Sequence, residues 1–193
     1  MKQNKKELIS YAAIEVISKE GFHSATTDKI AAEAGISVGL VYYYFKNKEE
    51  ILEYIFEMEC EKRSTLLKEL KKSNLHPLAK IMKMVEHHFR IVAEDHKVAK
   101  IILRERHLPF CIPGGIGKIG GVPKFIREVV EEGVEAGQIR ECNAEIMSIA
   151  IFGIIEEVLN RYILEKEEKQ DSNLLDDSLQ EIGELLEKGL VRI

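Results

Sequence analysis

Apolar residues recur at helical spacing along almost the whole chain, and this pattern restricts the possible folds more than any other feature. Alternation with a period of two, which indicates half-buried strands, is almost absent. The sequence therefore predicts an all-α protein of about nine helices. The expected helices cover residues 9–17, 28–34, 38–45, 49–70, 77–93, 96–107, 123–136, 143–167 and 173–190.

The composition is that of a globular protein with a core, because 45% of the 193 residues are hydrophobic and 32% are charged. No window approaches the roughly 18 consecutive apolar residues that a membrane span needs. The N-terminal lysines are not followed by an apolar stretch, so no signal peptide is expected. The cysteines Cys60, Cys111 and Cys142 are odd in number and far apart, which favours reduced thiols in a cytoplasm.

The charge is distributed unevenly along the chain. Residues 1–48 carry seven lysines and five acidic residues, so this segment has a balance of +2 within a total of −5. The remainder therefore carries −7. This asymmetry indicates two parts with different partners. We expect a three-helix domain at residues 1–48 and a larger helical domain at 49–193.

Two short expected helices, "DKIAAEA" and "VGLVYYYF", are joined by a turn containing Gly35, which predicts a helix-turn-helix. Thr26 or Thr27 can cap the first of these helices, and Ser37 can cap the second. Two short helices within an ordinary core would give the same pattern. The side chains of the second helix distinguish these alternatives.

On a helical projection, Val38, Val41, Tyr42 and Phe45 form one stripe, whereas Gly39, Leu40 and Tyr43 lie opposite and Tyr44 lies on the flank. An ordinary amphipathic helix would carry charged residues on its outer side. A glycine, a leucine and a tyrosine there favour a helix that enters a DNA groove. Lys48, at the start of the next helix, can neutralise a phosphate.

The run "TTDKIAAEAGISVGLVYYYFKNKEEIL" resembles the DNA-binding signature of the TetR family of bacterial transcriptional regulators. The resemblance covers about the first 55 residues and implies a role for each matching position. Phosphates would be held by Thr27, Tyr44 and Lys48. Bases or the groove wall would face Ser37, Val38, Gly39 and Tyr43. Tyr42 would be partly packed, and Val41 and Phe45 would belong to the core.

No arginine precedes Arg63, so the bidentate arginine–guanine contact is not available to the expected groove-facing helix. We therefore expect few direct hydrogen bonds to bases and a large contribution from apolar contacts and DNA shape.

The resemblance also implies a helical C-terminal domain that dimerises and binds a small effector. The expected helices 143–167 and 173–190 have apolar surfaces wide enough to need cover from a second subunit. A two-fold dimer would read a near-palindromic operator with half-sites ~34 Å apart.

The stretches "DHKVAKIILRE" and "IFGIIEEVLNRYIL" are similar to the FadR branch of that family, whose members respond to long-chain acyl-CoA. The resemblance implies a repressor that releases DNA when this hydrophobic effector binds. Apolar side chains would line the acyl site, and Arg104 or Arg106 would meet the phosphates. The expected apolar lining is Met82, Met84, Phe89, Val92, Ile102, Phe110, Phe125 and Phe152.

Two other functions fit parts of the sequence. "GIGKIG" at residues 115–120 matches a dinucleotide-binding pattern, so a small nucleotide-cofactor enzyme is an alternative, although no βαβ unit surrounds it. A regulator that acts through protein partners is another. His87 and His88 point about 100° apart on a helix and cannot hold one metal. We expect no catalytic residues, no cofactor and no metal.

Overall fold

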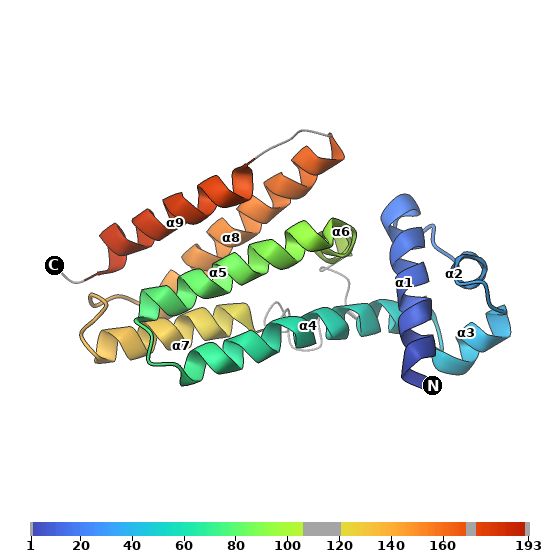
Figure 1. Ribbon diagram of the computed structural model, residues 1–193, viewed down its shortest axis with the longest axis horizontal. Coiled ribbons are helices and arrows are strands. Elements are labelled where there is room, and N and C mark those ends of the chain that lie inside the picture. Colours follow the sequence, from blue (N-terminus) through green and yellow to red (C-terminus); the bar gives the residue numbers. More distant parts are fainter. Residues whose placement is uncertain (1, 106–120, 169–172, 192–193) are drawn as a thin grey trace. The chain divides into compact units, whose positions relative to one another are not determined.

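The computed structural model describes residues 2–105, 121–168 and 173–191. This part of the chain contains nine α-helices, and its only β-pairing is an isolated bridge between Ile139 and Val191. Figure 1 shows their order. The helices are α1 (Lys2–Glu20), α2 (Thr27–Glu33), α3 (Val38–Tyr44), α4 (Lys48–Lys72), α5 (Pro77–Glu94), α6 (His96–Glu105), α7 (Val122–Glu135), α8 (Ala144–Glu167) and α9 (Leu174–Leu190).

The all-α prediction is confirmed, and most helix ends fall within two residues of the predicted ones. Side-chain caps explain several of these ends. The backbone N–H groups of Lys29, Leu40 and Glu50 donate to side-chain oxygens three residues earlier, at 3.3, 3.3 and 2.8 Å. Thr26, and not Thr27, is the cap of α2. None of the described helices is both long and apolar enough to cross a membrane.

The chain divides into two compact units. Unit 1 comprises the described residues of Met1–Glu61 and Asp95–Lys118, and unit 2 those of Lys62–Glu94 and Ile119–Ile193. Helix α4 begins in unit 1 and continues into unit 2. Residues 49–61 and α6, which the sequence places in the larger domain, thus lie with the N-terminal helices.

In unit 1, α1 packs against both α2 and α6, and α2 packs against α3. An ion pair supports the α1–α6 contact, because the Lys97 ammonium is 2.6 Å from a carboxylate oxygen of Glu15. That ammonium, as hydrogen-bond donor, lowers the pKa of Glu15. Gly35 has a φ of 64°, which allows the tight turn between α2 and α3.

In unit 2, α5 packs against α7, α8 and α9, and α7 also packs directly against α8 (Figure 1). Its buried residues at spacings of three and four make the core with α7, where Phe125, Ile126, Val129 and Val130 face inward. Gly133 permits close packing at the end of α7, because a Cβ there would lie 2.6 Å from Ile139 Cδ1.

A polar pair is buried within this unit. The Arg63 Nε donates to His88 Nδ1 at 3.1 Å, and both side chains are almost fully covered. Burial, reinforced by the charge of Arg63, lowers the pKa of His88 to about 3. His88 is therefore a neutral acceptor that satisfies one donor of the buried guanidinium.

The burial of His88 makes the free energy of unfolding of unit 2 depend on pH. Below pH ~6.5, His88 is protonated in the unfolded chain but stays neutral in the folded chain, so the free energy of unfolding is highest above that pH. It should fall by up to about 1.4 kcal/mol per pH unit as the pH drops toward 3. Urea unfolding at pH 5 and pH 7 measures this slope. His88→Gln keeps an acceptor for Arg63 and should reduce the slope, so an unchanged slope would contradict the assignment.

Candidate nucleic-acid interface

Helix α3 is anchored on one narrow side. Ser37 caps it through the N–H of Leu40, and Val41 is its only fully buried residue. Phe45 follows as the C-cap with an extended backbone, φ −139° and ψ 133°, and is 2% exposed. Val41 and Phe45 are thus core residues, as predicted, and the other residues of α3 are half-buried or exposed.

Two consecutive tyrosines of α3 point outward. Tyr42 is 55% exposed and Tyr43 is 66% exposed, whereas Tyr44 is half-buried. The rings of Tyr43 and Tyr44 meet edge to face, with centroids 5.1 Å apart. The sequence places Tyr42 on the stripe with Val38, Val41 and Phe45, but only Val41 of α3 is fully buried, so the packed side of the helix is narrower than the projection indicates. Tyr42 joins Tyr43 on the exposed surface.

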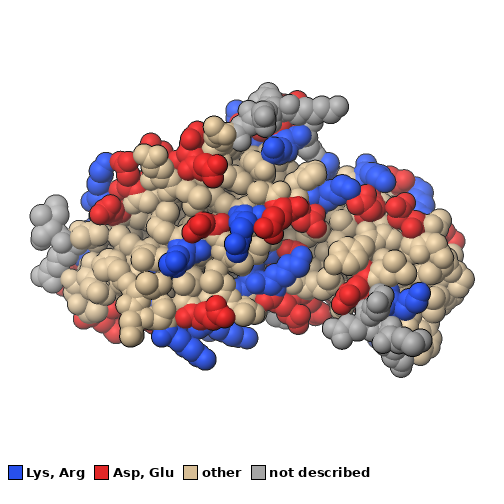
Figure 2. Space-filling model, in the orientation of Figure 1, with Lys and Arg blue, Asp and Glu red and all other residues tan. Residues whose placement is uncertain are grey.

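The rest of this surface is small and uncharged. Gly39 is exposed, and a Cβ built on it would meet nothing within 4 Å. Val38 and Leu40 are half-buried. In Figure 2 the surface around α3 is largely tan, the colour of uncharged residues. A helix with this face can approach DNA closely and contact it through tyrosine hydroxyls and apolar groups.

Thr27 and Ser37, which are predicted to contact DNA, lie at the N-terminal ends of α2 and α3. Thr27 is the first residue of α2 and half-buried, and Ser37 is exposed with its hydroxyl already accepting the cap hydrogen bond. Both lie where free N–H groups can bind a phosphate. Their DNA contacts remain predictions.

Lys48 makes extensive contacts inside the protein. Its ammonium donates to the carbonyls of Phe22, His23 and Ala25 at 2.8, 3.1 and 3.1 Å. It also lies 4.6 Å from the centroid of the Phe22 ring. All three ammonium hydrogens are thereby used to hold the loop between α1 and α2. The predicted phosphate contact would require one of these bonds to be exchanged.

A substitution at Gly39 tests whether this surface meets DNA. Gly39→Ala should stabilise α3 by ~0.5–1 kcal/mol, because alanine favours helix and the site is empty. The same methyl group should weaken operator binding, because it prevents close approach of the backbone. Thermal unfolding and operator titration measure the two effects. Unchanged operator affinity would show that Gly39 does not face the groove.

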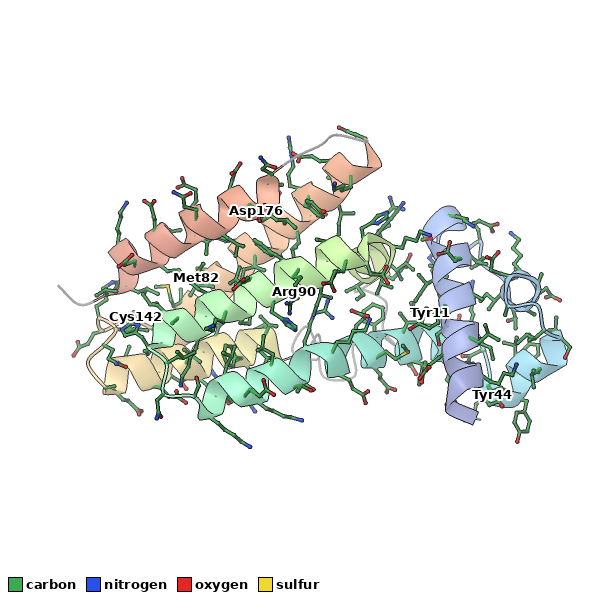
Figure 3. The ribbon with its side chains drawn as sticks, in the orientation of Figure 1. Tyr11, Tyr44, Met82, Arg90, Cys142 and Asp176 are labelled. Atoms are coloured by element: carbon green, nitrogen blue, oxygen red, sulfur yellow. The ribbon has the colours of Figure 1, made fainter. Side chains whose placement is uncertain are left out.

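The residues expected to line the effector site are divided between the units. Met84, Phe89 and Val92 on α5 and Phe125 on α7 are buried in unit 2, and Phe152 on α8 is half-buried. Ile102 and Arg104 lie on α6 in unit 1, the first buried and the second exposed. Met82 is half-buried on α5 and labelled in Figure 3. Their ligand contacts remain predictions.

Several predictions concern residues outside the described part of the chain. These are the roles of Arg106 and Phe110 in effector binding, the thiol of Cys111 and the glycine pattern at 115–120. Among the residues that are described, no group of three or more potential metal ligands occurs.

Helices α8 and α9 expose large apolar side chains. Although α8 and α9 pack against each other, four of their large apolar side chains are at least half exposed. These are Ile146, Ile149 and Leu164 on α8 and Leu185 on α9. Such side chains in water favour a partner surface. This is the face expected from the sequence to pair with a second subunit.

Comparison with known proteins identifies the family. The sequence model of the family described as "Bacterial regulatory proteins, tetR family" matches residues 9–55. The family model described as "Tetracyclin repressor-like, C-terminal domain" matches residues 74–162. The chain is 30% identical over 176 residues to the fatty acid metabolism regulator protein of Bacillus subtilis (strain 168), covering 89% of each. The chain belongs to the TetR family.

Solved structures of this family agree with the fold. FadR from Bacillus halodurans superposes with a TM-score of 0.78 at 28% identity, over 94% of each chain. FadR from Bacillus subtilis, in complex with stearoyl-CoA, gives 0.77 at 28% identity, over 93% of this chain and 96% of that one. The resemblance seen at residues 26–52, 95–105 and 151–164 is confirmed. TetR proteins are transcriptional regulators, and the enzyme alternative is not favoured.

Proposed function

We propose that this TetR protein is a repressor that binds a near-palindromic operator as a homodimer and is released by long-chain acyl-CoA. The observation that carries the proposal is its similarity, over nearly its whole length, to a FadR structure that holds stearoyl-CoA. The exposed Gly39, Tyr42 and Tyr43 supply a surface able to enter a DNA groove.

A dimer supplies the second DNA-contacting surface. The exposed isoleucines and leucines of α8 and α9 are the best candidates for the subunit interface, because burying them gains hydrophobic free energy. Two copies of α3 related by a two-fold axis would address half-sites about one helical turn apart. Replacement of one exposed isoleucine by a charged residue, such as Ile149→Glu, would weaken both dimerisation and operator binding.

Helix α4 provides the covalent route from effector to DNA. It starts at Lys48, whose ammonium is bound to the loop before α2, and continues into unit 2. A ligand that changes the direction of α4 would change the separation of the two α3 helices in the dimer. The effector lowers operator affinity by the difference between its affinities for the two states.

Binding of the full-length protein to genomic DNA fragments, over a range of salt concentrations, tests the DNA-binding part. We expect retention of a few fragments that share a near-palindrome, with an affinity that falls as salt rises. Binding that is equal for all fragments would contradict a specific operator. It would favour a regulator that acts through protein partners.

A further inference from the structure

An open hollow lies on unit 2 where one face of α5 meets α4. Its volume is about 180 Å³, and its lining comes from Leu66 of α4 and from α5. The α5 residues follow one another at spacings of one, three and four, so they share one face of the helix. They are Lys83, Glu86, His87 and Arg90, of which Arg90 is labelled in Figure 3.

The hollow carries two cations and one carboxylate. Lys83, Glu86 and Arg90 are exposed, and none of them forms a salt bridge with another residue in the described part of the chain. Several other lysines and arginines of unit 2 are in ion pairs, for example Lys71 with Glu128 and Lys80 with Glu132. The charges of the hollow are therefore left for a solvent molecule or a ligand.

His87 lines the hollow and contacts the Arg90 guanidinium. Its Nδ1 lies 2.8 Å from the Arg90 Nη2, and because a guanidinium can only donate, Nδ1 is the acceptor. The hydrogen of the neutral ring then sits on Nε2, which is buried and makes no hydrogen bond. The nearby Lys62 carbonyl favours the protonated ring, but its contact with His87 does not reach hydrogen-bond geometry.

The ring is neutral in this setting. Burial lowers the pKa of His87, and the charges of Arg90 and Arg63 lower it further, against smaller opposing effects of Lys62 and Glu94. The neutral ring therefore keeps Nδ1 as an acceptor, and this bond holds the Arg90 guanidinium at the hollow.

We propose that this hollow is a phosphate-binding site, formed by Lys83, His87 and Arg90, that holds a phosphate group of the effector. The inference rests on the proposed function, since it assigns an anchor for the phosphorylated end of an acyl-CoA. Phosphate fits the site because it offers several acceptor oxygens and enough negative charge to attract two cations. It differs from the anchor expected at Arg104 or Arg106, which lies in another part of the chain.

Charge substitutions in the full-length protein test the site by calorimetric titration with stearoyl-CoA, stearic acid and inorganic pyrophosphate. Arg90→Ala should weaken stearoyl-CoA binding by about tenfold, and the double variant Lys83→Ala/Arg90→Ala by roughly a hundredfold. Glu86→Gln should strengthen it severalfold, since a repelling carboxylate is removed. Stearic acid, which lacks phosphate, should bind all variants equally.

The matched control is Lys124→Ala, which removes an exposed lysine of unit 2 outside the hollow and should leave stearoyl-CoA affinity unchanged. If the wild type binds stearoyl-CoA and the hollow variants bind it equally well, the inference is overturned while the proposed function stands. If the variants lose only pyrophosphate affinity, the hollow serves a free phosphate compound and the assignment to the effector is overturned. If the wild type binds no stearoyl-CoA, the proposed function itself fails.

Discussion

Replacing Phe45 by alanine is expected to destabilise unit 1 by about 3–5 kcal/mol and to abolish operator binding. Phe45 is 2% exposed and makes an edge contact with Tyr54, with ring centroids 5.7 Å apart. The ammonium of Lys6 lies 5.1 Å from the Phe45 ring centroid. The substitution would leave a cavity among these groups, at the point where α3 is fixed to α4.

Circular dichroism during urea unfolding measures this loss, since the chain has no tryptophan for fluorescence. Phe45→Leu refills most of the volume and should cost much less. A stability of Phe45→Ala close to that of the wild type would show that α3 is held in some other way. Its loss of DNA binding would then need a separate explanation.

Replacing Tyr42 and Tyr43 together by alanine should have the opposite balance: a large loss of operator affinity and little loss of stability. Both side chains are more than half exposed, so few core contacts are removed. A dimer loses four tyrosines. At ~1 kcal/mol for each lost contact, operator affinity falls by roughly 4 kcal/mol, which is on the order of a thousandfold.

Tyr11 offers a matched control, because it is 56% exposed on α1 in the same unit. Tyr11→Ala should leave operator affinity within a few-fold of the wild type. Tyr43→Phe removes only the hydroxyl and should produce part of the effect. If the Tyr42/Tyr43 variant lost stability as much as Phe45→Ala does, the assignment of the two faces of α3 would be wrong.

Local patterns were sufficient to predict the helices. The apolar spacing along α5, the Ser37 cap and the glycine at 35 each act within a few residues, and the structure has them as predicted. The degree of burial of Tyr42 is less predictable. The helical projection places it beside Val41, but only Val41 of α3 is fully buried and Tyr42 is 55% exposed.

Contacts between residues far apart in the sequence could not be predicted in this way. Lys48 meets carbonyls 23 to 26 residues earlier, and nothing near it in the sequence indicates this. The neighbours His87 and His88 differ in environment because α4 covers them unequally. His88 is a buried acceptor for Arg63, whereas His87 lines an open hollow. Only the packing of two helices separates their roles.

The most direct measurement is operator affinity of the full-length protein by fluorescence anisotropy, with and without saturating stearoyl-CoA. We expect specific binding to a near-palindromic fragment in the absence of effector. When stearoyl-CoA is bound, this operator affinity should fall roughly 5- to 150-fold. Unchanged operator affinity in a protein saturated with stearoyl-CoA would contradict it.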